Sequence, residues 1–115
     1  MNLRHVIVPF AVATALMSAA TAAHAQGNAA AGQHKTTMCV GCHGIPGYKS
    51  SFPAVYNVPK LGNQHAAYIV KALQAYKSGE RSHPTMRAIA AGLNDQDMAD
   101  LAAYYASENT RTAAK

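Results

Sequence analysis

The residues best suited to chemistry lie together in the run Cys39-Val40-Gly41-Cys42-His43, which contains both cysteines of the 115-residue chain. Two cysteines separated by two residues and followed by a histidine form the attachment signature of a c-type haem. At the end of a helix, two thiols so spaced can reach the two vinyl groups on one porphyrin edge, and the adjacent imidazole can face the iron. The motif predicts one covalent haem on Cys39 and Cys42, with His43 as an iron ligand.

Three other uses of the cysteine pair remain open. A thioredoxin-like redox pair needs a strand before the motif, in a βαβ unit, and no strand-like run precedes it. A structural disulfide is typical of secreted domains, but here it would close only a very small loop. A zinc site needs further ligands at a second paired spacing, which the remaining histidines of the predicted domain do not offer: His34, His65 and His83.

The haem iron needs a second axial ligand or an open position, and methionine and histidine are the available donors. Met38 adjoins the attachment motif on the same side and cannot reach across the ring. Met98 lies on the apolar stripe of the last predicted helix, where packing is its expected role. Met86 follows Pro84 in a segment predicted to be loop, from which its thioether can face the iron. We expect Met86 to be the second ligand, with His83 as the alternative.

Helices must position these side chains, because no part of the predicted domain shows strand-like alternation. A short helix is predicted over 26–38 with Asn28 as its N-cap. A second helix is predicted over 64–78, ended by Gly79, and a third begins at Asn94. Loops are predicted over 48–62 and 80–85, with one or two helical turns over 87–91. The expected fold class is therefore all-α, with three main helices plus short turns wrapped around one haem.

The composition indicates a domain that is completed by a bulky cofactor. Half of the residues are hydrophobic, yet 25 of the 115 are alanine and none is tryptophan. Alanine buries little apolar area, and short chains bury a smaller fraction of their surface than long ones. A chain of this kind is poorly equipped to form a core unaided, and a porphyrin would supply the missing apolar bulk.

Residues 1–25 have the features of a cleaved secretory signal peptide. Arg4 lies in a short basic start, the run 6–17 is almost wholly apolar, and small residues end in Ala23-His24-Ala25. The alternative is an uncleaved membrane anchor, which would need about 20 apolar residues, more than this run provides. We expect cleavage after Ala25 and one mature domain over 26–115, located outside the cytoplasm.

Five motifs follow one another along the predicted domain: Cys39-Val40-Gly41-Cys42-His43-Gly44, Pro59-Lys60-Leu61-Gly62-Asn63-Gln64, Tyr76-Lys77-Ser78-Gly79-Glu80-Arg81, Pro84-Thr85-Met86-Arg87 and Leu101-Ala102-Ala103-Tyr104-Tyr105. In content and order they resemble class I c-type cytochromes, in particular the single-haem bacterial periplasmic kind. They are also similar to one half of the tandem di-haem cytochromes, which are built from two such domains. The resemblance covers essentially the whole predicted mature chain.

The resemblance implies a role for individual residues. Cys39 and Cys42 would hold haem c through thioethers, and His43 and Met86 would be the axial ligands of its iron. The carbonyl oxygen of Pro59 would accept a hydrogen bond from Nδ1 of His43 and so fix the imidazole. Pro46 or Pro53 is the alternative source of that carbonyl.

Ligation by histidine and methionine fills both axial positions of the iron and leaves no position for a substrate. We therefore expect a periplasmic electron carrier, not an enzyme, that transfers one electron at a time between respiratory redox partners. The alternative is a haem c electron-transfer subunit of a periplasmic oxidoreductase complex. A five-coordinate haem that binds gases or peroxide is a weaker third possibility, since such proteins usually carry the motif near the C-terminus.

The charge distribution predicts the kind of partner. The formal net charge is +5, and residues 26–87 contain seven basic side chains against one acidic, whereas 88–115 contain two against four. A positive surface near the haem speeds encounter with redox proteins that carry acidic docking surfaces, although such charges also serve solubility. No clustered basic run indicates nucleic acid. Membrane contact is expected only through partner complexes, and the protein is expected to be a monomer or weak dimer.

Overall fold

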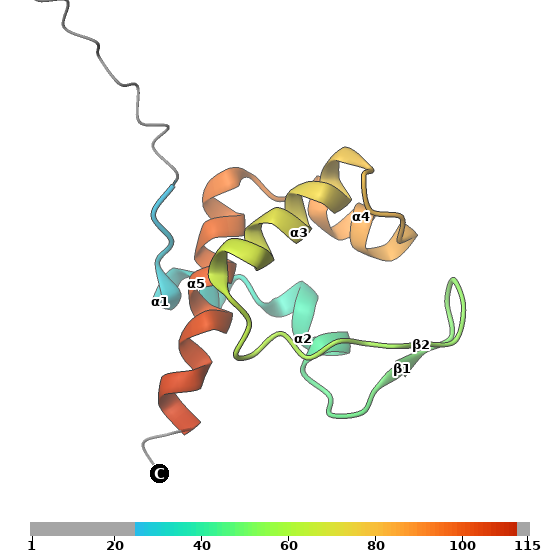
Figure 1. Ribbon diagram of the computed structural model, residues 1–115, viewed down its shortest axis with the longest axis horizontal. Helices are drawn as coiled ribbons and strands as arrows, with labels where there is room; N and C mark the ends of the chain where they lie inside the picture. Colours follow the sequence, from blue (N-terminus) through green and yellow to red (C-terminus); the bar gives the residue numbers. More distant parts are fainter. Residues whose placement is uncertain (1–24, 113–115) are drawn as a thin grey trace, which may run out of the picture.

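The computed structural model describes residues 25–112, and these form five helices and one short hairpin (Figure 1). The elements in chain order are α1 (Ala29–His34), α2 (Thr37–His43), β1 (Lys49–Ser50), β2 (Tyr56–Asn57), α3 (Ala66–Ser78), α4 (Pro84–Ala91) and α5 (Asp95–Thr112). The predicted helical fold class is confirmed. The predicted signal peptide, apart from its last residue, lies outside the described residues.

The extent of the first predicted helix is wrong, because the chain forms two helices, α1 and α2, instead of one over 26–38. The break comes at Lys35 and Thr36, whose backbone N–H groups bond carbonyls only three residues back, a tightening common at helix ends. Thr36 Oγ1 also donates to the carbonyl oxygen of Gln33 at 2.8 Å. The second helix therefore starts afresh and places the attachment motif at its C-terminal end.

The segment around Met86 is helical, not a loop as predicted. Helix α4 begins at Pro84, at the first position of the helix, where a missing N–H removes no helical hydrogen bond. The proline thus starts this helix instead of blocking one. Met86 lies in the first turn of α4, and the predicted turns over 87–91 form the remainder of it.

The loop predicted over 48–62 contains a short antiparallel hairpin that the sequence analysis missed. Lys49 pairs with Asn57, and Ser50 pairs with Tyr56. Two-residue strands are too short to show the alternation by which strands are recognised. The hairpin extends away from the helices in Figure 1.

Helix α5 is the centre of the packing, since both α1 and α3 lie against it, and α4 lies against α3 (Figure 1). Gly32 is buried where α1 crosses α5, and a Cβ atom there would lie 2.0 Å from the carbonyl oxygen of Asp100. Only glycine fits at this crossing. The core is formed mainly by α3 and α5, with these buried apolar side chains among its members: Ile69, Met98, Leu101, Ala102 and Tyr105.

A buried carboxylate, Asp100 on α5, ties the N-terminal segment to the rest of the fold. Asp100 is 3% exposed and accepts hydrogen bonds from Lys35 Nζ (2.7 Å), the Asn28 backbone N–H (2.8 Å) and Gln96 Nε2 (2.8 Å). Lys35 also pairs with Asp97 at 2.7 Å. These bonds, first among them the one from Lys35, lower the pKa of Asp100 to about 2. The fold therefore holds this group in its ionised form.

We expect Asp100→Asn to destabilise the fold and to reduce the acid sensitivity of its stability. A pKa lowered from 3.8 to about 2 on folding gives stability that is present above the unfolded-state pKa and is lost as pH falls through the folded-state pKa. Denaturant midpoints measured from neutral pH down to about pH 2 should fall less steeply in the variant. Asp95→Asn, which alters an exposed carboxylate in the same helix, should keep the pH dependence of the midpoint seen in the unchanged protein. The same pH dependence in Asp100→Asn would contradict the lowered pKa of Asp100.

Candidate functional site

Helix α2 carries Cys39, Cys42 and His43, and His43 is its last residue. Cys39 is half-buried and Cys42 is exposed. Their spacing of three residues puts them on one helix face. Burial raises the pKa of the Cys39 thiol, and a hydrogen bond with Tyr105 acts in the opposite direction. The helix thus presents two sulfur atoms from neighbouring turns, as attachment to one edge of a flat group requires.

The imidazole of His43 is held by the backbone of the following loop. Its Nδ1 donates a hydrogen bond of 2.7 Å to the carbonyl oxygen of Pro59. Because a carbonyl oxygen can only accept, Nδ1 carries the proton, and Nε2 keeps the lone pair that a metal requires. This is the contact that the family resemblance implies, and Pro59 supplies the carbonyl.

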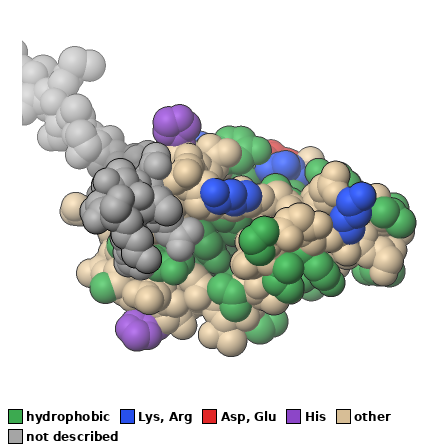
Figure 2. Space-filling model, turned by 90° about the horizontal axis from the view of Figure 1, so that it is seen from below, with side chains coloured by type: hydrophobic (Ala, Val, Ile, Leu, Met, Phe, Trp, Pro, Cys, Tyr) green, Lys and Arg blue, Asp and Glu red, His purple; other side chains and the backbone are tan. Residues whose placement is uncertain are grey.

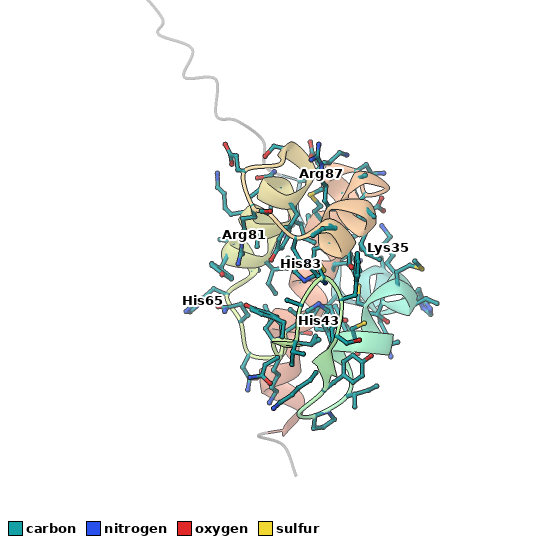
Figure 3. All side chains as sticks on the ribbon, turned by 90° about the vertical axis from the view of Figure 1, so that its right-hand side faces the viewer. Lys35, His43, His65, Arg81, His83 and Arg87 are labelled. Atoms are coloured by element: carbon teal, nitrogen blue, oxygen red, sulfur yellow. The ribbon has the colours of Figure 1, made fainter. Side chains whose placement is uncertain are left out.

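The second predicted ligand, Met86, is half-buried in the first turn of α4. His83, the alternative ligand, is the N-cap of the same helix, and its Nδ1 accepts a hydrogen bond of 3.3 Å from the Met86 backbone N–H. In Figure 3, His43 and His83 both lie in the middle of the molecule, on α2 and at the start of α4 respectively, whereas His65 lies at its edge. This capping role was not predicted, although a polar residue directly before a proline at a helix start is a signal for it.

The other two methionines within residues 25–112 occupy very different environments. Met98 is fully buried in the core, so its predicted packing role is confirmed. Met38 is 70% exposed beside Cys39.

Arg81 forms a second feature that the sequence analysis did not anticipate. Its Nη1 donates to the hydroxyl of Tyr68 at 3.4 Å, and its guanidinium carbon lies 4.8 Å from the centre of the Tyr76 ring. Both tyrosines come from α3, so this charged side chain is held against that helix. Among the described Lys and Arg side chains, only Lys35 forms an ion pair, and Arg81 therefore keeps its positive charge unpaired.

Large apolar side chains are exposed around the attachment motif and in the loop that follows it. The most exposed are Val55 (78%), Met38 (70%), Phe52 (64%) and Tyr56 (58%), and Figure 2 shows several groups of hydrophobic side chains on one face of the molecule. Exposed apolar surface of this kind indicates a site that a ligand or partner covers. A porphyrin fits these surroundings, and two thiols, an imidazole and a thioether are donors that it and its iron accept.

The described residues give no support to the zinc alternative, because within 25–112 no three His, Cys, Asp or Glu side chains come together as a metal site. None of the helices described is long and apolar enough to cross a membrane. A small helical domain with this motif and this fixed imidazole is a c-type haem protein.

Comparison with known proteins agrees with that class. The family model "Cytochrome c" matches residues 24–107, and the chain belongs to this family. Its fold is that of class I cytochromes c, covalently bound haem c is the cofactor of the family, and Cys39 and Cys42 have the spacing of the attachment motif. Haem-based electron transfer is the general function of this family.

Several relatives show how much of the chain is shared. Cytochrome c4 of Pseudomonas aeruginosa is 45% identical over 86 residues, which cover 75% of this chain and 41% of that protein. Cytochrome c-554(548) of Halomonas halodenitrificans is 41% identical over 85 residues, covering 71% of this chain and 98% of that protein. The crystal structure of reduced recombinant cytochrome c4 from Pseudomonas stutzeri superposes with a TM-score of 0.57 at 39% identity, over 70% of this chain and 45% of that one. The chain thus spans less than half the length of the cytochrome c4 relatives.

Proposed function

We propose that this chain is a one-electron carrier whose haem iron is bound by His43 and Met86. The observation that carries the proposal is the hydrogen bond of 2.7 Å from His43 Nδ1 to Pro59, which fixes the imidazole and leaves Nε2 for the iron. The imidazole belongs to α2, the helix that also carries both thiols, whereas Met86 belongs to α4. Ligands from two separate elements can approach one metal ion from opposite sides.

The haem, when bound, supplies a one-electron change between ferric and ferrous iron. Cys39 and Cys42 would hold it on α2, and the Pro59 carbonyl keeps the His43 ring in one orientation and would increase its donor strength toward the iron. With His43 and Met86 both bound to it, the iron would have no position left for a substrate. We therefore propose a carrier and not an enzyme.

We propose that the carrier acts in the periplasm after removal of residues 1–25. The proposal rests on the basic start, apolar run and Ala23-His24-Ala25 ending of that segment. Redox proteins with acidic docking surfaces are the proposed partners. The basic side chains that form no ion pair in the described part of the chain support this, among them Lys49, Lys60, Lys71, Arg81 and Arg87.

A second candidate is an electron-transfer subunit of a periplasmic oxidoreductase complex. One relative favours it: a protein named thiosulfate dehydrogenase electron acceptor, from Stutzerimonas stutzeri, is 38% identical over 65 residues. That match covers 56% of this chain and 29% of that protein. A stable stoichiometric partner that co-purifies at physiological salt would favour the subunit, and isolation of the chain alone would favour the diffusing carrier.

The visible absorption spectrum of the purified protein tests the proposed ligation. We expect a reduced-minus-oxidised spectrum of a six-coordinate, low-spin haem c that is nearly unchanged by dilute imidazole, because Met86 must first leave the iron. A spectrum that shifts fully at dilute imidazole would show a vacant sixth position. Haem c would then remain, but the carrier proposal with two protein ligands would be overturned.

A further inference from the structure

His83 occupies the boundary between a loop and the helix that carries Met86. Its backbone is extended (φ −159°, ψ 106°), and its side chain caps α4 by accepting the Met86 N–H at Nδ1, 3.3 Å away. Pro84 follows at the first helical position and has no N–H to donate. The backbone N–H groups in the first turn of a helix have no partner within the helix. The one that His83 binds belongs to Met86, the proposed iron ligand.

The His83 ring is itself held by two other elements. Its centroid lies 6.2 Å from that of Tyr56 on β2 and 6.4 Å from that of Tyr76 on α3, both edge-on. Aromatic contacts of this geometry are favourable beyond the area they bury. His83 thus connects the hairpin, α3 and the first turn of α4 at a half-buried point.

We propose that His83 is a positioning residue for Met86: it fixes the backbone of the first turn of α4 so that the thioether meets the iron. This rests on the proposed function, in which Met86 is the axial ligand. An iron–thioether bond forms most readily when the sulfur is already in place. Any alternative arrangement of the first turn of α4 lowers the fraction of molecules in which the thioether can bind the iron. His83 acts through Met86 and does not itself bind the iron.

The experiment compares variants of the holoprotein by their affinity for added imidazole in the oxidised state and by their reduction potential. His83→Ala removes the cap, whereas His83→Asn restores a side chain that is among the best N-caps. We expect His83→Ala to bind imidazole roughly 2- to 30-fold more tightly, the range that loss of an N-cap implies. Its potential should fall, and His83→Asn should return both values close to those of the unchanged protein.

His65 provides a matched control, because it is also the N-cap residue of a helix, α3, but makes no side-chain capping hydrogen bond. His65→Ala should leave imidazole affinity and potential unchanged. Where His83→Ala does not accumulate with haem, His83→Gln replaces it, since glutamine keeps a polar side chain but is not a preferred N-cap.

Met86→Ala, measured in parallel, separates failure of this inference from failure of the proposed function. If Met86→Ala binds imidazole much more tightly and His83→Ala does not, the positioning role is overturned and the axial ligand stands. If His83→Asn has the same imidazole affinity and reduction potential as His83→Ala, the hydrogen bond to the Met86 N–H does not position the thioether, and the inference is overturned. If Met86→Ala itself is unchanged, the proposed ligation fails, and the inference fails with it.

Discussion

Replacing Met86 with alanine should open the haem iron to added ligands and lower its reduction potential. Alanine offers no donor atom, so the sixth position becomes available to water or to an added imidazole. A thioether paired with an imidazole raises the potential relative to nitrogen or oxygen ligands. Axial-ligand identity accounts for a range of about 0.8 V among haem proteins, so the shift should far exceed the error of a redox titration.

Met38 provides the matched control for this substitution. It is 70% exposed and lies next to Cys39, so Met38→Ala removes a thioether close to the attachment motif from a position that cannot reach the far side of the ring. Its spectrum and potential should equal those of the unchanged protein. An unchanged spectrum and potential in Met86→Ala would eliminate Met86 as a ligand.

The prediction of Met86 shows which inferences from sequence depend on local structure. Its selection rested on donor chemistry, on the exclusion of Met38 and Met98, and on a predicted loop from which its thioether could face the iron. The loop predicted around it was wrong, because Pro84 lies at the first position of helix α4. Proline is compatible with a helix at the first position and incompatible further in, and the polar residue directly before it, His83, is the signal that favours the first position.

Helix ends that depend on nearby residues were predictable. The side chain of Asn28 accepts from the backbone N–H of Ala31 at 3.0 Å, as its predicted N-cap role requires. Gly79 ends α3 in the left-handed conformation, with φ of 90°, which glycine adopts without strain. Asn94 accepts from the backbone N–H of Asp97 at 2.8 Å. Each of these signals acts within a few residues, so the sequence contains all of the information.

Contacts between distant segments were not predictable in the same way. The contact of Tyr56 with His83 and the hydrogen bond from Lys35 to Asp100 join residues far apart in sequence. No pattern in the sequence pairs them, because their proximity results from the packing of whole helices. The His43–Pro59 contact is of the same kind, and only the family resemblance anticipated it.

The double variant Cys39→Ser/Cys42→Ser should lose covalent haem and with it most of the folded structure. Apart from haem, the core is small: among the described residues Met98 is the largest wholly buried side chain, whereas Phe52 and Val55 are mostly exposed. Full burial of one large apolar side chain contributes about 1.5–3 kcal/mol to the free energy of unfolding. Few of the large side chains described here are fully buried. A ligand that binds only the folded state stabilises that state, so we expect the far-UV circular dichroism of the variant to show little helix.

Val40→Ser is the control for the double variant, because it places a serine between the two cysteines on an exposed side chain of the same helix. It should retain haem through denaturing extraction and keep the full helical signal, whereas the double variant should have the mass of the polypeptide alone. Haem that survives denaturing extraction from the double variant would refute attachment through these thiols. A native-like helical spectrum without haem would instead show that the helices pack against α5 without the cofactor. The large apolar side chains of the loop would then be exposed for another purpose, such as docking to a partner.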